Sequence, residues 1–462
     1  MVVHRRRRFL SRAGFTGCCI LCCLILLIFI SSMFEFNVIS TSEDMPREKL
    51  KTMAKWDPSY RQGSQFPLSG QISCDRTQLR YDLCWINGRT VLDPTTSAFF
   101  VVRSTNSAPP YLVETIKPYP RKFEAFIMAQ IKELTITSGP FAPSCQVQHT
   151  APALVFSAGG YTGNFFHDFN DGFIPLYITV NTIYPDQDFV MVVSEAPDWW
   201  ISKYVDLLSA FTAHPIVTLN DTSTHCFPSV TFGLISHGFM TMNQRLMPNS
   251  KTITQFRGLL DKAYSQSLTS NVNNNLSAPK SRPRLIIASR NGSAGRVILN
   301  QDELIEMSKE LGFDVIIFEP KANTSLQESY VLVNSSHAMI GVHGAALTHS
   351  LFLRPGSVLV QVVPIGLEWA SDAFFGRVGR GLKLEYVEYK IGVEESSLVG
   401  TYGSDSLLLT DPHGIQVQGK GWPGDIMDVY LKEQNVKLDM KRFREYLKQA
   451  YKKAKQFMDR EG

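Results

Sequence analysis

The fold of the C-terminal half of the chain follows from residues 338–364, which read AMIGVHGAALTHSLFLRPGSVLVQVVP. An apolar run at 338–341 leads through glycines into a helical segment at 344–353, and a second apolar run follows at 357–364. Val/Ile-rich runs joined by helices are typical of parallel strands covered on both faces. On either side the pattern predicts further strands at 284–289, 314–318 and 383–389, and helices at 300–311 and 325–335. We therefore expect a Rossmann-like domain over residues 284–438.

The preceding half, residues 67–270, alternates less regularly between strand and helix patterns. Strands are predicted at 153–156, 189–194 and 215–219, and helices at 164–180 and 200–211. Residues 271–283 are rich in Asn, Ser and Pro, a composition typical of a linker. An N-terminal Rossmann-like domain is thus expected, joined by this linker to the C-terminal one.

The last segment, residues 439–462, carries apolar residues at helical spacing among lysines and arginines. The stripe consists of Phe443, Leu447, Ala450, Tyr451, Ala454 and Phe457. We interpret it as a closing helix that packs across the two domains, and a helix on a membrane surface is the alternative.

A charge-free apolar segment spans residues 13–34, long enough for a helix to cross a bilayer. Five arginines precede this segment and Glu35 follows it, and positive flanks stay in the cytosol. The pattern predicts a cytosolic tail at 1–12, an uncleaved anchor at 13–34, a stem at 35–66 and a lumenal body. A cleaved signal peptide is the alternative, but its core is shorter and ends at small residues.

Composition and charge exclude some classes of protein. A hydrophobic fraction of 44% and a charged fraction of 19% are typical of a folded chain. The net charge is +4, but because five of the 46 Lys+Arg residues lie in the N-terminal tail, the remainder is nearly neutral. No basic face for nucleic acid is therefore predicted.

Cysteines and glycosylation sequons fit a lumenal body. Four cysteines lie outside the anchor, an even number in an oxidising compartment, so up to two disulfides are expected. These are Cys74, Cys84, Cys145 and Cys226; a Cys74–Cys84 bridge is the local pairing, and the sequence does not fix it. The cysteines within the anchor are interpreted as apolar filler, with palmitoylation as the alternative. Candidate N-glycosylation sites are Asn220, Asn275, Asn323 and Asn334, and a fifth sequon begins at Asn291.

Residues 159–171, GGYTGNFFHDFND, follow a predicted strand and open a helix. His167 and Asp171 are four apart and share a helix face, and Asp168 is adjacent to His167. A histidine oriented by a carboxylate suits general base catalysis. The three residues are therefore catalytic candidates. The alternative is that the two aspartates stabilise the first turn of the helix.

Two loops after predicted strands suit a diphosphate. Arg290, Asn291 and Arg296 lie in ASRNGSAGR (288–296), where paired guanidinium groups can grip phosphate oxygens. A surface hairpin or glycosylated loop is the alternative. His343, Gly344 and Ala345 form a tight turn before a helix, which lets a phosphate approach backbone N–H groups. This turn is not G-x-G-x-x-G, which disfavours nicotinamide chemistry, and a buried core role is the alternative for His343.

Glu368 and Trp369 follow the predicted strand at 357–364. A carboxylate there could bind a sugar hydroxyl and an indole could stack on a ring, so both are donor-binding candidates; an ordinary helix start is the alternative. No metal or other cofactor is predicted, because the one D-x-D sequence, Asp186-Gln187-Asp188, precedes a buried strand and is interpreted as a turn.

Four of these segments together resemble glycosyltransferase family 61, the plant Golgi pentosyltransferases that decorate xylan. They read GGYTGNFFHDFNDGFIPLY, SRNGSAGR, GVHGAALTHSLFLRPGSVLVQVVP and EWASDAFFGRVGRGLKLEYVEYKI. The resemblance covers residues 144–454 and is greatest for the branch of xylan arabinosyltransferases and xylosyltransferases. It implies an α/β, GT-B-like fold, with two Rossmann-type domains facing a cleft, behind a type II Golgi membrane anchor. It also implies inverting transfer from a UDP-sugar.

The resemblance also implies roles for the candidate residues. His167, oriented by Asp168 or Asp171, would deprotonate a xylosyl hydroxyl while Arg290, Arg296 and the helix after Gly344 stabilise the departing UDP. The expected reaction transfers arabinofuranose from UDP-arabinofuranose to the xylan backbone of cell-wall hemicellulose. Alternatives are a xylosyltransferase using UDP-xylose, a transferase acting on protein N-glycans, and a non-catalytic Golgi scaffold or glycan-binding protein. Other Golgi glycosyltransferases are expected partners.

Overall fold

A computed structural model describes residues 71–102, 111–138, 141–265, 281–290, 295–418 and 427–461. The predicted tail, anchor and stem, most of the linker, Asn275 and Asn291 lie outside these ranges. Within the described ranges no helix has the length and apolar character that crossing a membrane requires. The chain divides into two compact units, and the larger, Ser64–Pro412 with Asp428–Gly462, contains every element discussed below except most of α14 (Pro412–Gln418).

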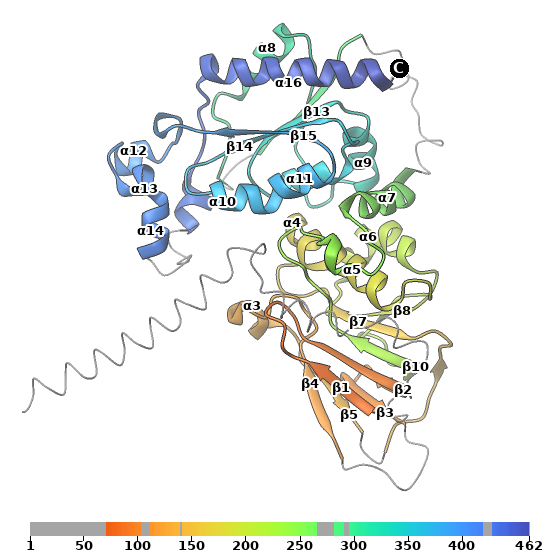
Figure 1. Cartoon of the computed structure of the whole chain (residues 1–462). Coiled ribbons are helices and arrows are strands. Elements are labelled where there is room, and N and C mark those ends of the chain that lie inside the picture. Colours follow the sequence, from red (N-terminus) through yellow and green to blue (C-terminus); the bar gives the residue numbers. More distant parts are fainter. Residues whose placement is uncertain are drawn as a thin grey trace, which may run out of the picture. The chain divides into compact units, whose positions relative to one another are not determined.

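The N-terminal half of the larger unit is built on a mixed ten-stranded sheet with the order β4-β5-β3-β2-β10-β7-β8-β9, in which β1 pairs with β2 and β6 with β10 (Figure 1). The strands are β1 (Gln71–Asp75), β2 (Leu83–Asp93), β3 (Ala98–Val101), β4 (Val113–Ile116), β5 (Leu134–Thr137), β6 (Val147–Gln148), β7 (Ala153–Ser157), β8 (Val190–Ser194), β9 (Val217–Thr218) and β10 (His225–Phe232). Only the section β10-β7-β8-β9 is continuously parallel, as a Rossmann-like domain requires. The antiparallel pairs of β2 with β1, β3 and β10 were not predicted from the sequence.

The parallel section is buried on both faces, which explains its continuous apolar runs. Alternate residues of β7 divide between two cores: Leu154 and Phe156 join one, and Ala153 and Val155 join the other. The helices of this half are α3 (Ala125–Gln130), α4 (Phe165–His167), the π-helix η2 (Asp168–Phe173), α5 (Ile174–Ile183), α6 (Asp198–Phe211), η3 (Gln244–Leu246) and α7 (Ile253–Tyr264). The helix predicted at 164–180 therefore forms, but as α4, η2 and α5 in succession. A π-turn inside a helix is frequently found at a functional site.

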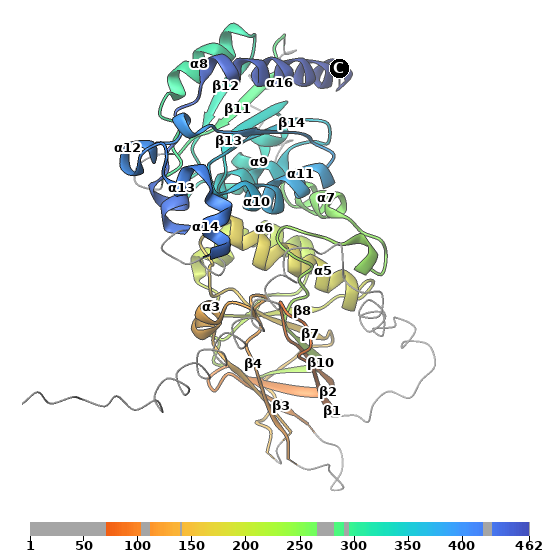
Figure 2. The same ribbon diagram turned by 60° about the vertical axis from the view of Figure 1, so that its left-hand side comes forward.

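The C-terminal half contains the predicted parallel sheet, with strand order β12-β11-β13-β14-β15. Its strands are β11 (Arg284–Ala288), β12 (Asp314–Phe318), β13 (Ala338–Val342), β14 (Val358–Val363) and β15 (Glu385–Lys390). Helices cover both faces in the two views, with α8 (Gln301–Glu310) and α16 (Met440–Glu461) opposite α9 (Leu326–Asn334) and α11 (Arg377–Gly381) (Figures 1 and 2). The strand order reverses between β11 and β13. Ligands of such sheets bind at that point, beyond the carboxyl ends of the strands.

The remaining elements of this half are short, apart from the closing helix. They are η6 (Ala345–Phe352), α10 (Glu368–Ser371), η7 (Asp372–Gly376), η8 (Val393–Glu395), α12 (Val399–Tyr402), α13 (Leu407–Thr410) and η9 (Val429–Glu433). The predicted closing helix forms as α16, and its stripe from Phe443 to Phe457 is buried. The elements against which it packs most, α8, β13, β14 and β15, all belong to the C-terminal half. The sequence had led us to expect that this helix packs across both domains, whereas its main contacts lie within one of them.

The two halves are joined through α7, which packs on α9, η6 and α11. The buried side chain of Arg257 on α7 donates from Nε to the carbonyl of Leu353 at 2.6 Å and from Nη2 to Oδ1 of Asn334 at 2.7 Å. Hydrogen bonding of a buried guanidinium to carbonyl oxygens offsets its desolvation. Asn334 therefore has a structural role, whereas Asn220 and Asn323 are exposed.

All four cysteines of the described body are paired. Cys74 and Cys84 face each other directly in the β1–β2 ladder, with a Cα–Cα distance of 4.0 Å. Cys145 is bonded to Cys226 on β10, 81 residues further along the chain. The first bridge closes a local hairpin and the second ties the segment before β6 to the centre of the sheet.

Candidate functional site

The loop after β7 turns sharply and places His167 on the first turn of a helix. Gly160 and Gly163 have φ angles of 62° and 101°, a region that favours glycine. A Cβ at Gly160 would also come within 2.9 Å of the Tyr119 ring. Asn164 then caps α4 by accepting a hydrogen bond from the backbone N–H of Phe166 at 3.1 Å. The local sequence thus fixes where the helix begins and which way His167 points.

His167 and Asp171 form a dyad across the π-turn. Nδ1 of His167 lies 2.7 Å from Oδ2 of Asp171, whose side chain is almost fully buried. Two atoms that present only lone pairs repel each other at this distance, so we assign a proton to Nδ1. The other ring nitrogen, Nε2, makes no hydrogen bond to any residue that the structure describes. The dyad therefore leaves Nε2 available as a proton acceptor.

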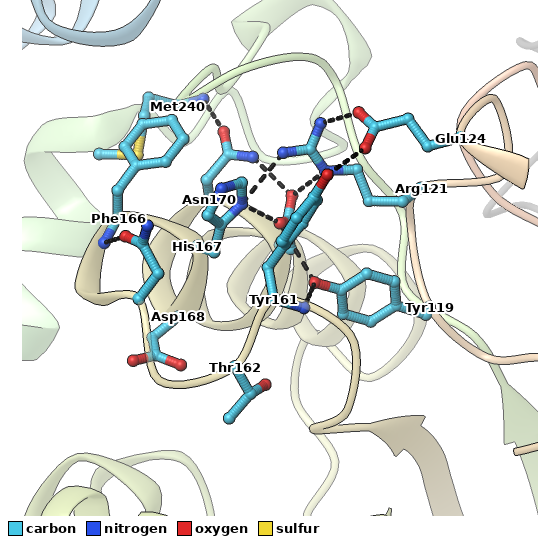
Figure 3. Close-up of polar contacts among 12 residues, drawn as sticks. Tyr119, Arg121, Glu124, Tyr161, Thr162, Phe166, His167, Asp168, Asn170 and Met240 are labelled. Carbon is cyan, nitrogen blue, oxygen red and sulfur yellow. Dashed lines mark hydrogen bonds and ion pairs between the residues drawn. The ribbon is translucent and has the colours of Figure 1, made fainter. Parts of the chain in front are cut away.

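Arg121, which sequence reasoning missed, holds the dyad in place (Figure 3). Its Nε donates to Oδ1 of Asp171 at 3.0 Å. Its Nη2 lies 3.0 Å from Nδ1 of His167, and this contact is not a hydrogen bond because both nitrogens carry protons. Its third nitrogen, Nη1, is ion-paired with Glu124. Arg121 precedes Asp171 by 50 residues and lies among other charged residues, in KPYPRKFE (117–124), so no local signal marked it in the sequence.

Two tyrosines complete the support of the dyad. The Tyr119 hydroxyl donates to Oδ2 of Asp171 at 3.2 Å and accepts from the backbone N–H of Tyr161 at 3.3 Å. The Tyr161 ring stacks on the imidazole of His167 with centroids 4.2 Å apart, and its hydroxyl donates to Glu124 at 3.0 Å. Both the plane and the position of the imidazole are therefore fixed.

The charge state of Asp171 follows from these neighbours. Burial alone would raise the pKa of Asp171, but the Arg121 guanidinium, followed by the hydrogen bond from His167, outweighs burial and lowers it. Asp171 is consequently ionised at neutral pH. A permanent carboxylate against Nδ1 stabilises the imidazolium that forms when Nε2 takes up a proton.

Asp168 has a different position from the one expected. Its side chain points away from His167, Asn170 and Arg121, as Figure 3 shows. The Asp168 carboxylate accepts from the Tyr204 hydroxyl at 2.7 Å and from the backbone N–H of Gly163 at 3.3 Å, and burial raises its pKa. Asp168 therefore anchors the glycine loop to α6, and Asp171 alone orients the histidine.

Arg290, Arg296 and Gly344 come together at the carboxyl ends of β11 and β13, where the strand order reverses. A Cβ at Gly344 would lie 2.7 Å from Nη1 of Arg290 and 3.2 Å from Nη1 of Arg296. Arg296 itself has a left-handed φ of 58°, and its Nη1 donates to the carbonyl of His343 at 3.1 Å. Backbone conformations of this kind persist where the surrounding structure enforces them, often at ligand sites.

The two guanidinium groups have unsatisfied hydrogen-bonding capacity. Nη1 of Arg290 and Nε of Arg296 are buried without a hydrogen-bond partner among the described residues, and neither side chain forms an ion pair there. Burial lowers the pKa of Arg290, and burial followed by the charge of Arg290 lowers the pKa of Arg296 to about 9. Two buried cations beside each other are costly without a counter-charge. The arrangement suits an anionic ligand such as a diphosphate. Asn291, the third candidate in this loop, lies outside the described residues.

His343 is neutral and accepts a hydrogen bond at Nδ1. Its Nδ1 lies 2.9 Å from the side-chain nitrogen of Gln361 and 3.1 Å from Oγ of Ser371. The oxygen of the Gln361 amide accepts from the Tyr386 hydroxyl, so the amide nitrogen faces His343 and Nδ1 accepts. Burial, then Arg296 and Arg290, lowers the pKa of His343 to about 3, so the ring is neutral with its proton on Nε2. In the sequence, the signal for this network is a single polar residue, Gln361, within an apolar run. The structure buries Gln361 fully.

The turn after His343 adds backbone donors. Gly344 has a φ of 153°, and η6 begins at Ala345. The first N–H groups of a helix have no partner within the helix. Ala345 and Ala346 therefore present backbone N–H groups beside the two guanidinium groups, which is the arrangement that phosphate sites use.

Glu368 and Trp369 begin α10, at the carboxyl end of β14. The Trp369 side chain is 40% exposed and packs edge-on against Phe239, with ring centroids 5.8 Å apart. Phe239 follows β10 of the N-terminal half. Trp369 thus lies where the two halves meet, since its ring also packs edge-on against Phe374 with centroids 5.9 Å apart, and its role in donor binding stays a prediction. Glu368 is half-buried and lies near Tyr430, whose pKa its charge helps to raise.

Comparisons with known proteins agree in the family they identify. The family described as Glycosyltransferase 61 matches residues 163–360. A xylan glycosyltransferase of Arabidopsis thaliana is 39% identical over 83% of this chain and 80% of its own length. An alpha-1,3-arabinosyltransferase of Oryza sativa subsp. japonica is 34% identical over 90% of this chain and 69% of its own. A beta-1,2-xylosyltransferase of the same rice is 31% identical, over 85% of this chain and 86% of its own.

Proposed function

Since the chain belongs to glycosyltransferase family 61 and resembles its plant xylan branch, we propose that it transfers a pentose from a UDP-sugar to a xylosyl residue of the xylan backbone. Arabinofuranose is the proposed pentose, in keeping with the similarity to a rice alpha-1,3-arabinosyltransferase over 90% of this chain. The similarity to an Arabidopsis thaliana xylan glycosyltransferase supports xylan as the acceptor.

One observation carries the proposal: the His167–Asp171 dyad and the unsatisfied arginines are joined by packed rings. The Phe166 ring lies 4.8 Å from that of Phe374, and Phe374 lies 5.8 Å from the ring of His343. A proton acceptor and an anion site are therefore held next to each other by contacts between the two halves. Glycosyl transfer to a hydroxyl requires this combination.

The proposed mechanism is a displacement of UDP from the anomeric carbon of the pentose. Nε2 of His167 takes the proton of a xylosyl hydroxyl as that oxygen forms a bond to the anomeric carbon of the pentose. The bond from the anomeric carbon to the diphosphate breaks, and UDP leaves with the electron pair. Attack from the face opposite UDP inverts the anomeric configuration. Arg290, Arg296, His343 and the N–H groups of Ala345 and Ala346 stabilise the charge that develops on the diphosphate.

The same proposal includes activity without a metal ion, a GT-B-like arrangement and a place in the Golgi membrane. The two guanidinium groups supply the positive charge that a metal ion would otherwise provide, so we expect turnover to persist in EDTA. The β7–α4 and β13–η6 loops lie at strand ends of two α/β halves, which supports a GT-B-like arrangement. The apolar segment at 13–34 supports a type II anchor in the Golgi membrane, with other Golgi glycosyltransferases as partners.

A second donor, UDP-xylose, is favoured by the similarity to the rice beta-1,2-xylosyltransferase, which extends over 86% of that protein's length. The two donors differ in the ring size of the pentose. Both donors carry the same UDP group. The proposed diphosphate site would contact that group, so it does not discriminate between the two pentoses.

A donor panel tests the proposal. The full-length protein in detergent micelles is incubated with xylohexaose and either UDP-arabinofuranose or UDP-xylose, and products are identified by mass and by arabinofuranosidase or xylosidase digestion. A pentose added from UDP-arabinofuranose alone supports the arabinosyltransferase, and one from UDP-xylose alone supports the second candidate. UDP binding without transfer from either donor would contradict both and favour a non-catalytic glycan-binding protein.

A further inference from the structure

A row of aromatic side chains runs away from the dyad, with two members on the N-terminal half and one on the C-terminal half. The row is made of Phe123, Phe239 and Trp369, and we call it the aromatic row. Phe239 lies edge-on to both neighbours, 6.3 Å from Phe123 and 5.8 Å from Trp369. Phe123 is 38% and Trp369 40% exposed, so the ends of the row reach solvent.

Arg80 is inserted into this row. Its guanidinium carbon lies 4.7 Å from the centroid of the Phe239 ring and 5.2 Å from that of Phe123. Within the described chain the Arg80 side chain forms no hydrogen bond and no ion pair, although burial lowers its pKa. A guanidinium held between two rings keeps its N–H groups at the edge of the stack. These donors are left for a ligand.

The row is continuous with the catalytic dyad. The Arg121 guanidinium, which holds Asp171, lies 5.3 Å from the centroid of Phe239 and 5.3 Å from that of Tyr161. Tyr161 in turn stacks on His167. Any molecule that covers the row therefore extends towards the histidine that accepts the proton.

We propose that Arg80 and the aromatic row bind the acceptor, a stretch of the neutral xylan backbone on one side of the reacting xylosyl residue. The inference rests on the proposed function and adds residues that select the acceptor. Each xylopyranosyl ring has an apolar C–H face that suits an aromatic ring, and hydroxyl groups at its edge that suit the N–H groups of a guanidinium.

Charge favours a neutral ligand over an acidic one. Arg80 interacts electrostatically with Arg121, Asp171 and Glu124. The two arginines and the two carboxylates balance, so the cluster has no surplus positive charge with which to select a uronic acid. Trp369 thereby acts on the acceptor, not on the donor as its position in the sequence predicted.

Acceptor kinetics test the proposal in the full-length protein. Trp369→Ala and Arg80→Gln should each raise KM for xylohexaose about fivefold to tenfold, as expected for loss of one aromatic or cation–π contact. The affinity for UDP should stay within about twofold. Trp369→Phe and Arg80→Lys should recover part of the loss. Phe141→Ala is the matched control, because Phe141 is 84% exposed and forms no ring contact with described residues.

Direct binding separates failure of this inference from failure of the proposed function. Xylohexaose is titrated into each folded variant, with the melting temperature recorded, and binding is measured by calorimetry without any donor. Weaker binding by Trp369→Ala and Arg80→Gln than by wild type supports the inference even if no donor is turned over. Equal affinities, no binding by the wild type, or a parallel loss of UDP affinity in Trp369→Ala would overturn it.

Discussion

The Phe165 ring stacks on the imidazole of His349, with centroids 4.1 Å apart and planes 20° from parallel. Phe165 opens α4, two residues before His167, and His349 lies on η6, just after the Gly344 turn. Burial lowers the pKa of His349 to about 4, so the ring is neutral and packs as an aromatic. The contact therefore couples the position of the proposed base to that of the proposed diphosphate site.

The two aspartates beside His167 should respond differently to the same substitution. Asp171→Asn removes the charge that orients and supports the imidazole, so we expect kcat to fall about 100-fold or more. Asp168→Asn keeps an oxygen that can accept from Tyr204 and Gly163, so kcat should fall less than about tenfold, with a lower melting temperature. Steady-state kinetics on both variants check this. A larger loss in Asp168→Asn would reverse the assignment.

Replacing Arg121 by Gln should shift the pH dependence of activity. Arg121 is the main cause of the lowered pKa of Asp171, and without it burial raises that pKa. The acid limb of the pH profile of kcat/KM should then move to higher pH, because protonation of Asp171 removes the carboxylate that supports His167. Arg76→Gln, which removes an arginine that is paired at the surface, is the matched control. An unchanged acid limb would contradict the role of Arg121.

The ion pair of Arg121 and Asp171 makes the free energy of unfolding depend on pH. Because its pKa is lower in the folded state than in the unfolded chain, ionised Asp171 stabilises the fold above pH about 4. This contribution is lost as the pH falls through the lower folded-state value. Urea unfolding should show a smaller drop in stability below pH about 4 for Asp171→Asn than for the wild type. An identical drop in the wild type and in Asp171→Asn would show that ionised Asp171 does not contribute to the stability of the fold.

Gly344→Ala should weaken the diphosphate site selectively. The added Cβ would lie 2.7 Å from Nη1 of Arg290, on a backbone with a φ of 153°. Displacement of Arg290 should weaken UDP binding about tenfold or more. Gly400→Ala, where a Cβ meets nothing within 4 Å, should leave UDP affinity unchanged. Calorimetric titration with UDP measures the affinity of each variant. Equal affinities in Gly344→Ala and Gly400→Ala would contradict a close approach of Arg290 to Gly344.

The two disulfides should differ in what they contribute to stability. The Cys145–Cys226 bridge closes 81 residues and the Cys74–Cys84 bridge closes 10. In the chain-entropy account the longer loop contributes about 4 to 5 kcal/mol and the shorter about 3 kcal/mol to the free energy of unfolding. Double Cys→Ser variants of each pair, compared by urea denaturation, check the order. A larger loss from the Cys74–Cys84 pair would contradict it.

The parallel sheet of the C-terminal half was predictable because burial on both faces leaves continuous Val/Ile runs in the sequence. The clustering of Arg290, Arg296 and His343 was predictable from the strand ends, since parallel strands all point to one edge. The antiparallel pairs of β2 with β1, β3 and β10 were not predicted. β10 lies more than 100 residues beyond β2 along the chain, so no local pattern indicates that the two strands pair.

The catalytic loop shows where sequence reasoning stops. Helical spacing favours Asp171 as the partner of His167, whereas adjacency favours Asp168, and only the side-chain directions decide. The π-turn between them leaves no trace in hydrophobic periodicity. Arg121 and Trp369 acquire their roles from contacts between distant segments, with Asp171 and Phe239 respectively, so local patterns carry no information about them.

The most direct test of the central claim is single-turnover transfer by His167→Ala. The full-length variant is mixed with xylohexaose and the active UDP-pentose, and UDP affinity is measured on the same preparation, with His214→Ala as the control histidine. We predict a rate about 100-fold to 10,000-fold below wild type with UDP affinity within about twofold. A wild-type rate in His167→Ala would contradict the assignment of His167 as the base.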